Sequence, residues 1–201
     1  MKKKFLKSSL DLIKKNNPTL DDIKIEEIRY GLESVYLTIT KLVIIFLIAY
    51  MLNIVRSVFI LMVTFNIIRN KAFGLHATKS IYCLISSLLL FIGGSYVCVY
   101  VVFPIVIKVI LAVICVICIC KYAPADTVKR PLVNAEKRRK YRMSSILRVV
   151  IYTILIIIFD KYTISNYLLI GMIEAVIMIH PKTYKFFKLP FNNYKNYEYG
   201  V

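Results

Sequence analysis

Residues 81–103 read IYCLISSLLLFIGGSYVCVYVVF, 23 residues in a row without a charged side chain. An α-helix rises about 1.5 Å per residue, so about 20 apolar residues cross the hydrocarbon core of a bilayer. This stretch therefore predicts a transmembrane helix. It indicates that the chain is an integral membrane protein rather than a water-soluble domain.

The rest of the 201-residue chain supports this class, because 59% of its residues are hydrophobic and its mean hydropathy is +0.68. Such a composition excludes a disordered chain and disfavours a soluble globular domain. The apolar segments are residues 35–52, 54–68, 81–103, 105–120, 145–159 and 164–180. We expect an all-α integral membrane protein with six transmembrane helices. Only Asn53 and Pro104 separate the first and second, and the third and fourth, so tight turns are predicted there.

Basic residues are distributed unevenly between these segments, and the net charge is +17. Of the 28 Lys and Arg residues, 24 fall in residues 1–41, 69–79, 121–142 and 181–201. Cytoplasmic loops of membrane proteins carry such an excess. We therefore expect a multi-pass cell-membrane protein with both termini in the cytoplasm. The positive charge is assigned to topology and lipid headgroups, and no nucleic-acid partner is expected.

Residues 1–34 predict two short amphipathic helices, separated by Asn16-Asn17-Pro18-Thr19. Lysines flank the first apolar stripe, which suits the surface of an anionic leaflet. A solvated helix packed on the protein itself is an equally good interpretation. The start has no uninterrupted apolar stretch, so no cleavable signal is expected. We thus divide the chain into interfacial helices (1–34), a six-helix membrane domain (35–180) and a basic, aromatic cytoplasmic tail (181–201).

A histidine and a cysteine stand in the first of the basic loops, His76 seven residues before Cys83. Cysteine nucleophiles act as thiolates, and an imidazole can take the thiol proton and return a proton to a leaving amine. The start of a helix and the nearby Arg69, Lys71 and Lys79 favour an anionic sulfur.

Their spacing requires a bend, because residues seven apart on one helix are separated by about 10 Å along its axis. Gly74 supplies the backbone freedom for it, so we place His76 on a loop or re-entrant segment folded toward Cys83. A lone membrane cysteine is more often a small apolar residue. The pair by itself therefore leaves a catalytic and a packing role open.

Two motifs together resemble a known family. Arg69-x4-Gly74-x-His76-Ala77-x5-Cys83 is followed in the next basic loop by Tyr122-Ala123-Pro124-Ala125-Asp126-Thr127-x3-Pro131. In this order and context the chain is similar to the AgrB family, the accessory gene regulator B peptidases of Gram-positive quorum sensing. The resemblance covers essentially the whole chain. The family usually has two adjacent glycines before x-His-Ala, whereas this chain has Phe73 ahead of Gly74.

The resemblance implies a membrane-embedded cysteine endopeptidase that cuts an AgrD-like pro-peptide on the cytoplasmic side. Its N-terminal part would be retained as a thioester on Cys83 and closed into a thiolactone or lactone ring. By motif position, Cys83 would be the nucleophile and His76 the general base and acid, supported by Arg69 and Gly74. No cofactor is implied, and a homodimer is a reasonable expectation for so small a bundle.

The second basic loop suits the acidic tail that AgrD-like precursors carry. The residues expected to attract it are Lys129, Arg130, Lys137, Arg138 and Arg139. Alternatively these charges only set topology and bind headgroups. Asp126 would orient His76 in a triad-like arrangement. An Asx-turn, or a salt bridge to Lys129 or Arg130, explains it as easily.

Other charges lie inside the apolar segments, and a different function class follows from them. Glu174 should face the bundle interior and pair with Arg148 or Arg56. A small transporter or peptide exporter would use these three residues as an intramembrane polar path. Cys115, Cys118 and Cys120 lie in a wholly apolar run without a second ligand pair, so apolar packing is favoured over a metal site.

Overall fold

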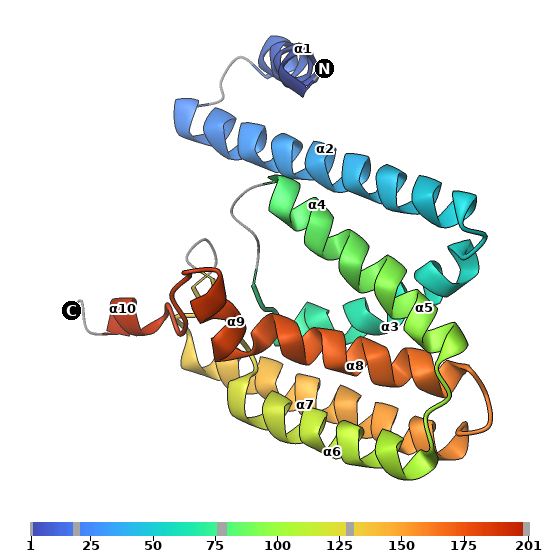
Figure 1. Cartoon of the computed structure of the whole chain (residues 1–201). Helices are drawn as coiled ribbons and strands as arrows, with labels where there is room; N and C mark the ends of the chain where they lie inside the picture. Colours follow the sequence, from blue (N-terminus) through green and yellow to red (C-terminus); the bar gives the residue numbers. More distant parts are fainter. Residues whose placement is uncertain (1, 18–20, 76–79, 128–130, 199–201) are drawn as a thin grey trace. The chain divides into compact units, whose positions relative to one another are not determined.

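The computed structural model describes residues 2–17, 21–75, 80–127 and 131–198, and these form helices without a β-strand, which confirms the all-α prediction (Figure 1). The helices in chain order are α1 Lys2–Asn16, α2 Asp22–Met51, α3 Val55–Ala72, α4 Ser80–Leu88, the π-helical η1 Leu89–Gly93, α5 Gly94–Tyr100, α6 Ile105–Tyr122, α7 Ala135–Ile158, α8 Ile164–Ile179, α9 Pro181–Phe186 and α10 Lys195–Glu198.

The chain divides into two compact units, Met1–Ile48 and Ala49–Val201. In the first unit the ring of Phe5 on α1 lies 5.2 Å from that of Tyr36 on α2, and Leu6 is buried. The expectation of two short helices before residue 35 was wrong in one respect. The second continues without a break into the first apolar segment, as the 30-residue α2. No proline interrupts this stretch, and its one glycine, Gly31, is tolerated inside a helix.

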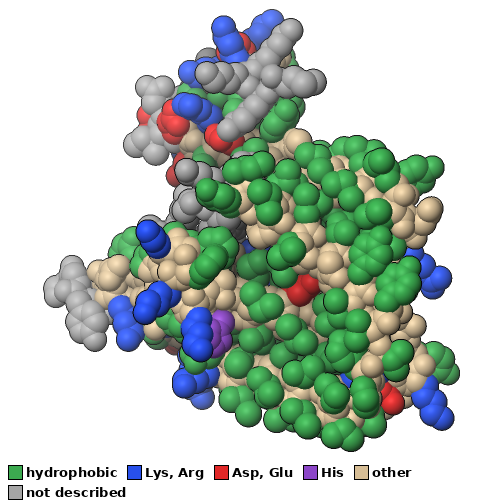
Figure 2. All heavy atoms as spheres, viewed as in Figure 1, with side chains coloured by type: hydrophobic (Ala, Val, Ile, Leu, Met, Phe, Trp, Pro, Cys, Tyr) green, Lys and Arg blue, Asp and Glu red, His purple; other side chains and the backbone are tan. Residues whose placement is uncertain are grey.

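Four helices are long and apolar enough to cross a membrane: Lys24–Met51, Ile81–Tyr100, Ile105–Tyr122 and Ala135–Ile158. The apolar α8 is shorter, with 16 residues, and α3 carries three basic residues. Figure 2 shows hydrophobic side chains covering most of the face that it draws, with basic side chains near α9 and α10 and at the margins. These features fit a membrane protein, while six crossings and their orientation stay predictions.

The core of the second unit is built around α8, which packs against α3, α5, α6 and α7. Helices surrounded by other helices are apolar on most of their surface, as α8 is apart from Ser165, Asn166 and Glu174. Gly171 allows α3 to approach closely, since a Cβ there would lie 2.8 Å from Thr64 Oγ1. The Tyr152 hydroxyl donates to the Thr64 carbonyl at 3.1 Å. Small residues and interhelical hydrogen bonds of this kind hold membrane helices together.

The helices break at both predicted positions, with a hydrogen-bonded turn at Asn53 and an extended connection, residues 101–104, before α6. Asn53 has a φ of 55° after the end of α2, and the Ile54 and Asn53 amides donate to the carbonyls of Ala49 and Tyr50 at 2.9 and 3.1 Å. This is a Schellman motif with asparagine in the left-handed position. Pro104 precedes the first residue of α6 with a φ of −56°.

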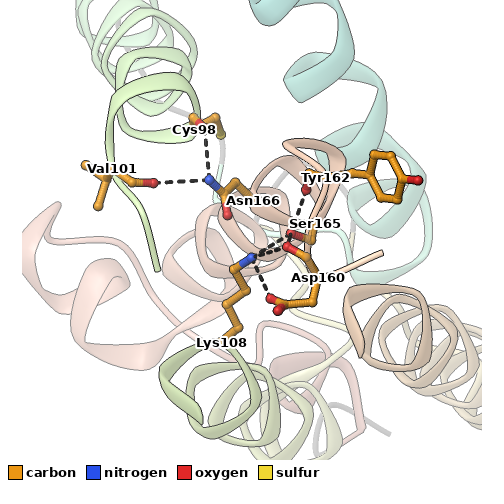
Figure 3. A network of polar contacts seen from close by, with 7 residues as sticks. All are labelled: Cys98, Val101, Lys108, Asp160, Tyr162, Ser165 and Asn166. Atoms are coloured by element: carbon orange, nitrogen blue, oxygen red, sulfur yellow. Dashed lines mark hydrogen bonds and ion pairs between the residues drawn. The ribbon is translucent and has the colours of Figure 1, made fainter. Parts of the chain in front are cut away.

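A buried lysine ties three elements together at the start of α6, which we call the Lys108 end of the bundle (Figure 3). Lys108 is 4% exposed, and its ammonium donates to the side chain of Asp160 at 2.8 Å, the Asp160 carbonyl at 2.9 Å and Ser165 Oγ at 2.8 Å. Three acceptors match the three N–H groups of an ammonium. Asn166 Nδ2 adds bonds to the carbonyls of Cys98 and Val101 at 3.0 and 3.1 Å.

Asp160→Asn should destabilise the fold by about 2–4 kcal/mol, because it leaves the buried Lys108 ammonium without its counter-charge. Lys108→Met should cost less, since the Asp160 side chain is 33% exposed and can be hydrated. The double variant Lys108→Met/Asp160→Asn should recover most of the stability that Asp160→Asn alone loses. Unfolding in detergent micelles measures all three, and a double variant as unstable as Asp160→Asn would contradict this account.

Candidate active site

The segment after α3 turns sharply and pairs with the loop that follows α6. The Gly74 amide donates to the Ala125 carbonyl, and the Ala125 amide donates to the Ala72 carbonyl, both at 2.9 Å. Gly74 has a φ of +114°, and a Cβ there would lie 2.8 Å from the Met178 carbonyl oxygen. Only glycine fits both the conformation and the space. The loop between α3 and α4, which we call the first motif loop, is therefore joined through its backbone to the loop between α6 and α7, the second motif loop.

Leu75 is held on both sides of its backbone. Its amide donates to the Met178 carbonyl at the end of α8 at 2.9 Å, and its carbonyl accepts from Arg69 Nη2 at 3.1 Å. His76 is the next residue in the chain, and it lies outside the described residues. Arg69 and the end of α8 thus fix Leu75, the residue before His76.

Arg69, in the last turn of α3, interacts with one other predicted site residue, Cys83, and with two residues that were not predicted, Leu75 and Tyr184. Its guanidinium lies over the Phe65 ring, 5.4 Å from the centroid. Burial lowers the pKa of Arg69, and the nearby Cys83 and Tyr184 act in the opposite direction by favouring its charged form. Cys83 is half-buried in the first turn of α4, as predicted. Arg69 therefore links Leu75, Cys83 and Tyr184 electrostatically.

A cavity of about 400 Å³ opens between the two motif loops. It is lined by Asn66, Arg69, Asn70, Phe73, Gly74, Ala125, Asp126 and Thr127. Three of the predicted site residues, Arg69, Gly74 and Asp126, are among these lining residues. Its volume suits a few residues of a peptide rather than a whole folded partner.

Asp126 is 2% exposed, and the bonds of its carboxylate lead to the end of the chain. Oδ1 accepts from the Asn193 amide and Oδ2 from the Tyr194 amide, each at 2.8 Å. Oδ2 also accepts from the Leu132 amide at 3.3 Å. Among the described residues Asp126 is thus an anchor for backbone amides, and its predicted role in orienting His76 stays a hypothesis.

The predicted substrate-binding cations divide into two groups. Lys129 and Arg130 lie outside the described residues. Lys137 and Arg139 are exposed in the first turns of α7, which Asn134 caps by accepting from the Lys137 amide at 2.9 Å. Arg138 is half-buried and donates to the carbonyls of Leu132 and Val133 at 2.9 and 2.7 Å. Of the three described cations, Lys137 and Arg139 are the more accessible to a ligand.

Sequence reasoning missed Tyr184, Met178 and the tail as parts of this region. Tyr184 is buried and its hydroxyl donates to the Asp126 carbonyl at 3.1 Å. Burial raises the pKa of Tyr184, the Asp126 carboxylate raises it further, and Arg69 opposes both, so the phenol remains a donor at neutral pH. A tyrosine in a basic, aromatic tail gave no signal that its partner lies 58 residues earlier.

Glu174 faces the interior as predicted, at 3% exposure, but its proposed pairing with Arg148 was wrong. Arg148 instead donates to the Ile67 carbonyl, and neither carboxylate oxygen of Glu174 has a hydrogen-bond partner among the described residues. Gly94 leaves room for the carboxylate, because a Cβ at Gly94 would lie 2.5 Å from Glu174 Oε1. Within the described ranges no three His, Cys, Asp or Glu side chains cluster as metal ligands would.

Comparison with known proteins agrees with the motifs. The family model for accessory gene regulator B matches residues 6–179. The chain belongs to the AgrB family. It is 36% identical over 171 residues to an accessory gene regulator protein B of Staphylococcus aureus, covering 85% of this chain and 88% of the relative. An AgrB-like protein of Clostridium acetobutylicum is 30% identical over 179 residues, covering 89% and 86%.

A third AgrB-like protein, from Listeria innocua, is 28% identical over 189 residues, covering 93% of this chain and 92% of the relative. No solved structure matches the chain.

Phe73 is the residue at which this chain departs from the motif. The resemblance leads us to expect a glycine at this position, and Phe73 has a φ of 59°. Its ring packs on Tyr141 with centroids 5.1 Å apart.

Phe73→Gly should be more stable than Phe73→Ala by about 1 kcal/mol, although ordinary backbone entropy favours alanine. Both lose the ring contact with Tyr141, but only glycine relieves the strain of a positive φ. Unfolding in detergent measures the difference. An alanine variant at least as stable as the glycine variant would show that the turn is not strained at this residue.

Proposed function

We propose that this AgrB-family protein is a membrane-embedded cysteine endopeptidase that cleaves an AgrD-like pro-peptide and promotes closure of its N-terminal part into a ring. Cys83 is the nucleophile, and His76 is the general base and acid. Arg69 and Gly74 support the site, and the reaction takes place at the cytoplasmic side of the membrane. The observation that carries the proposal is the cavity between the two motif loops, which three predicted site residues, Arg69, Gly74 and Asp126, line together.

The first step forms a thioester. The Cys83 thiol gives its proton to His76 while the sulfur attacks the scissile carbonyl carbon, and the tetrahedral intermediate collapses by breaking the C–N bond. The leaving amine takes the proton from His76. The C-terminal part of the pro-peptide departs, and its N-terminal part remains joined to Cys83.

The second step closes the ring without further energy input. A thiol or hydroxyl of the bound peptide attacks the thioester carbonyl, gives its proton to the departing Cys83 sulfur through His76, and displaces it. The peptide must be held folded back, since an intramolecular attack gains greatly from proximity, and water must be kept out because hydrolysis competes. A partly enclosed cavity at the end of a helix bundle suits both requirements.

The membrane arrangement supports this placement. Six helical segments coincide with the six apolar stretches, and the basic residues collect at the ends that carry the two motif loops. By the positive-inside rule these ends face the cytoplasm, together with both termini. A pro-peptide with an amphipathic leader would reach Cys83 along the membrane surface.

Cys83→Ala and His76→Ala should each reduce pro-peptide cleavage in reconstituted vesicles below about one thousandth of the wild-type rate, because each removes a reacting group. Cys120→Ala is the matched control, since Cys120 is an exposed cysteine at the end of α6. Mass spectrometry of trapped protein should find the acyl group on Cys83. Full cleavage by either active-site variant, or an acyl group on another cysteine, would disprove the mechanism.

Substrate capture is assigned to the exposed cations at the start of α7, Lys137 and Arg139, together with Lys129 and Arg130. Lys137→Glu/Arg139→Glu should raise the half-saturating pro-peptide concentration about 3- to 10-fold while leaving the saturated rate unchanged. The difference from wild type should shrink at high salt, because exposed charges are screened. An equal loss at low and high salt would assign these residues to topology alone.

A second function class rests on Glu174, a buried carboxyl without a hydrogen-bond partner among the described residues. Such groups are costly in a membrane and often mark transport pathways. A transporter would lose activity with Glu174→Gln and keep it with Cys83→Ala. The peptidase would show the reverse pattern, so this pair of variants decides between the two classes.

A further inference from the structure

The C-terminal segment is bound to the second motif loop by one buried carboxylate. Asp126 accepts from the amides of Asn193 and Tyr194 at 2.8 Å each. Hydrogen bonds to a charged acceptor are stronger than those between neutral groups. Two such bonds from consecutive residues fix both the position and the direction of the tail.

Aromatic and cationic contacts add to this attachment. The Tyr184 hydroxyl donates to the carbonyls of Asp126 and Ala125 at 3.1 and 3.4 Å. The Phe191 ring packs edge-on against Tyr184 with centroids 5.1 Å apart. The guanidinium of Arg138 lies over the Tyr194 ring, 4.0 Å from its centroid. The segment 181–198 is therefore attached at several points along its length.

The residues that receive these contacts are the ones that hold the first motif loop. The Ala125 carbonyl, which accepts from Tyr184, also accepts from the Gly74 amide at 2.9 Å. Beyond Gly74, the carbonyl of Leu75 is held by Arg69, whose charge also interacts with Tyr184. A continuous series of bonds thus connects the tail to the residue that precedes His76.

We propose that residues 181–198 form a strap that positions the first motif loop through Asp126 and Tyr184. This inference rests on the proposed peptidase function and goes beyond it by assigning a role to the tail. Asp126 and Tyr184 are positioning residues, which act through the loop: the Asp126 carboxylate is engaged by the amides of Asn193 and Tyr194. The strap holds the Gly74–Ala125 pairing in register and so fixes Leu75, the last described residue before His76.

A double-variant cycle separates this role from direct catalysis by Asp126. Asp126→Ala removes the anchor, and Tyr194→Pro removes an amide donor and disfavours the turn before α10. Each should slow thioester formation on Cys83 roughly 10- to 100-fold at saturating peptide, because small misplacements of reacting groups are costly. The double variant should be no slower than the slower single variant. Multiplied losses would overturn the proposal, since Asp126 would then act independently of the strap.

The probe is a synthetic AgrD-like pro-peptide with an amphipathic leader and an acidic tail, followed in single turnovers by mass spectrometry. Half-saturating concentrations should stay near wild type while the rate falls. Asp126→Asn, which keeps one carbonyl oxygen as acceptor, should recover part of the rate lost in Asp126→Ala. Tyr184→Phe should lower the rate without changing peptide binding. An unchanged rate in all of these variants would overturn the inference.

Hydrogen exchange tests the strap independently of activity. Asp126→Ala and Tyr194→Pro should speed exchange at the amides of Gly74 and Ala125, and leave exchange around Asn166 at the Lys108 end unchanged. Asp160→Asn is the matched control. It should speed exchange around Asn166, leave exchange at Gly74 and Ala125 unchanged, and give a wild-type acylation rate per folded molecule. If wild-type protein forms no Cys83 thioester, the peptidase proposal fails while exchange still decides whether the strap holds the loop. Unchanged exchange at Gly74 and Ala125 would refute the strap.

Discussion

Two backbone hydrogen bonds between the segment Ala72–Gly74 and Ala125 organise the end of the bundle that carries Cys83. They bring together loops that are far apart in the chain, and they satisfy amides that would otherwise be buried without partners. The pairing requires a residue without a Cβ at Gly74, because the end of α8 lies directly against it. Arg69, Leu75 and the cavity walls all take their positions from this contact.

The two ends of the bundle use buried polar groups in different ways. At the Lys108 end every N–H of a buried ammonium has an acceptor, and the network links α5, α6 and the turn before α8. At the Cys83 end the half-buried Arg69 borders a cavity of about 400 Å³. A saturated network favours rigidity, whereas an open polar cavity favours binding. The stable end therefore supports the end where chemistry is proposed.

The tail illustrates why charge alone is an incomplete account of a basic segment. Its lysines contribute to the excess of cations that predicts a cytoplasmic location. Its backbone amides bond Asp126 and its Tyr194 ring contacts Arg138, while Phe191 and Tyr184 pack together within the tail. One segment can thus set topology through its exposed charges and support a site through its buried groups.

Hydropathy and motif order were sufficient for the class, the apolar segments, the turn at Asn53, the helix break at Pro104, and the AgrB family. These features depend on local composition and on residues close in sequence, which a single chain displays directly. Only the tertiary structure decided that α2 is continuous, that Lys108 binds Asp160 52 residues later, and that Asp126 holds amides 67 and 68 residues away. A carboxylate can accept from any donor that packing brings within about 3 Å, so its partner is determined by the arrangement of helices and not by its neighbours in the chain.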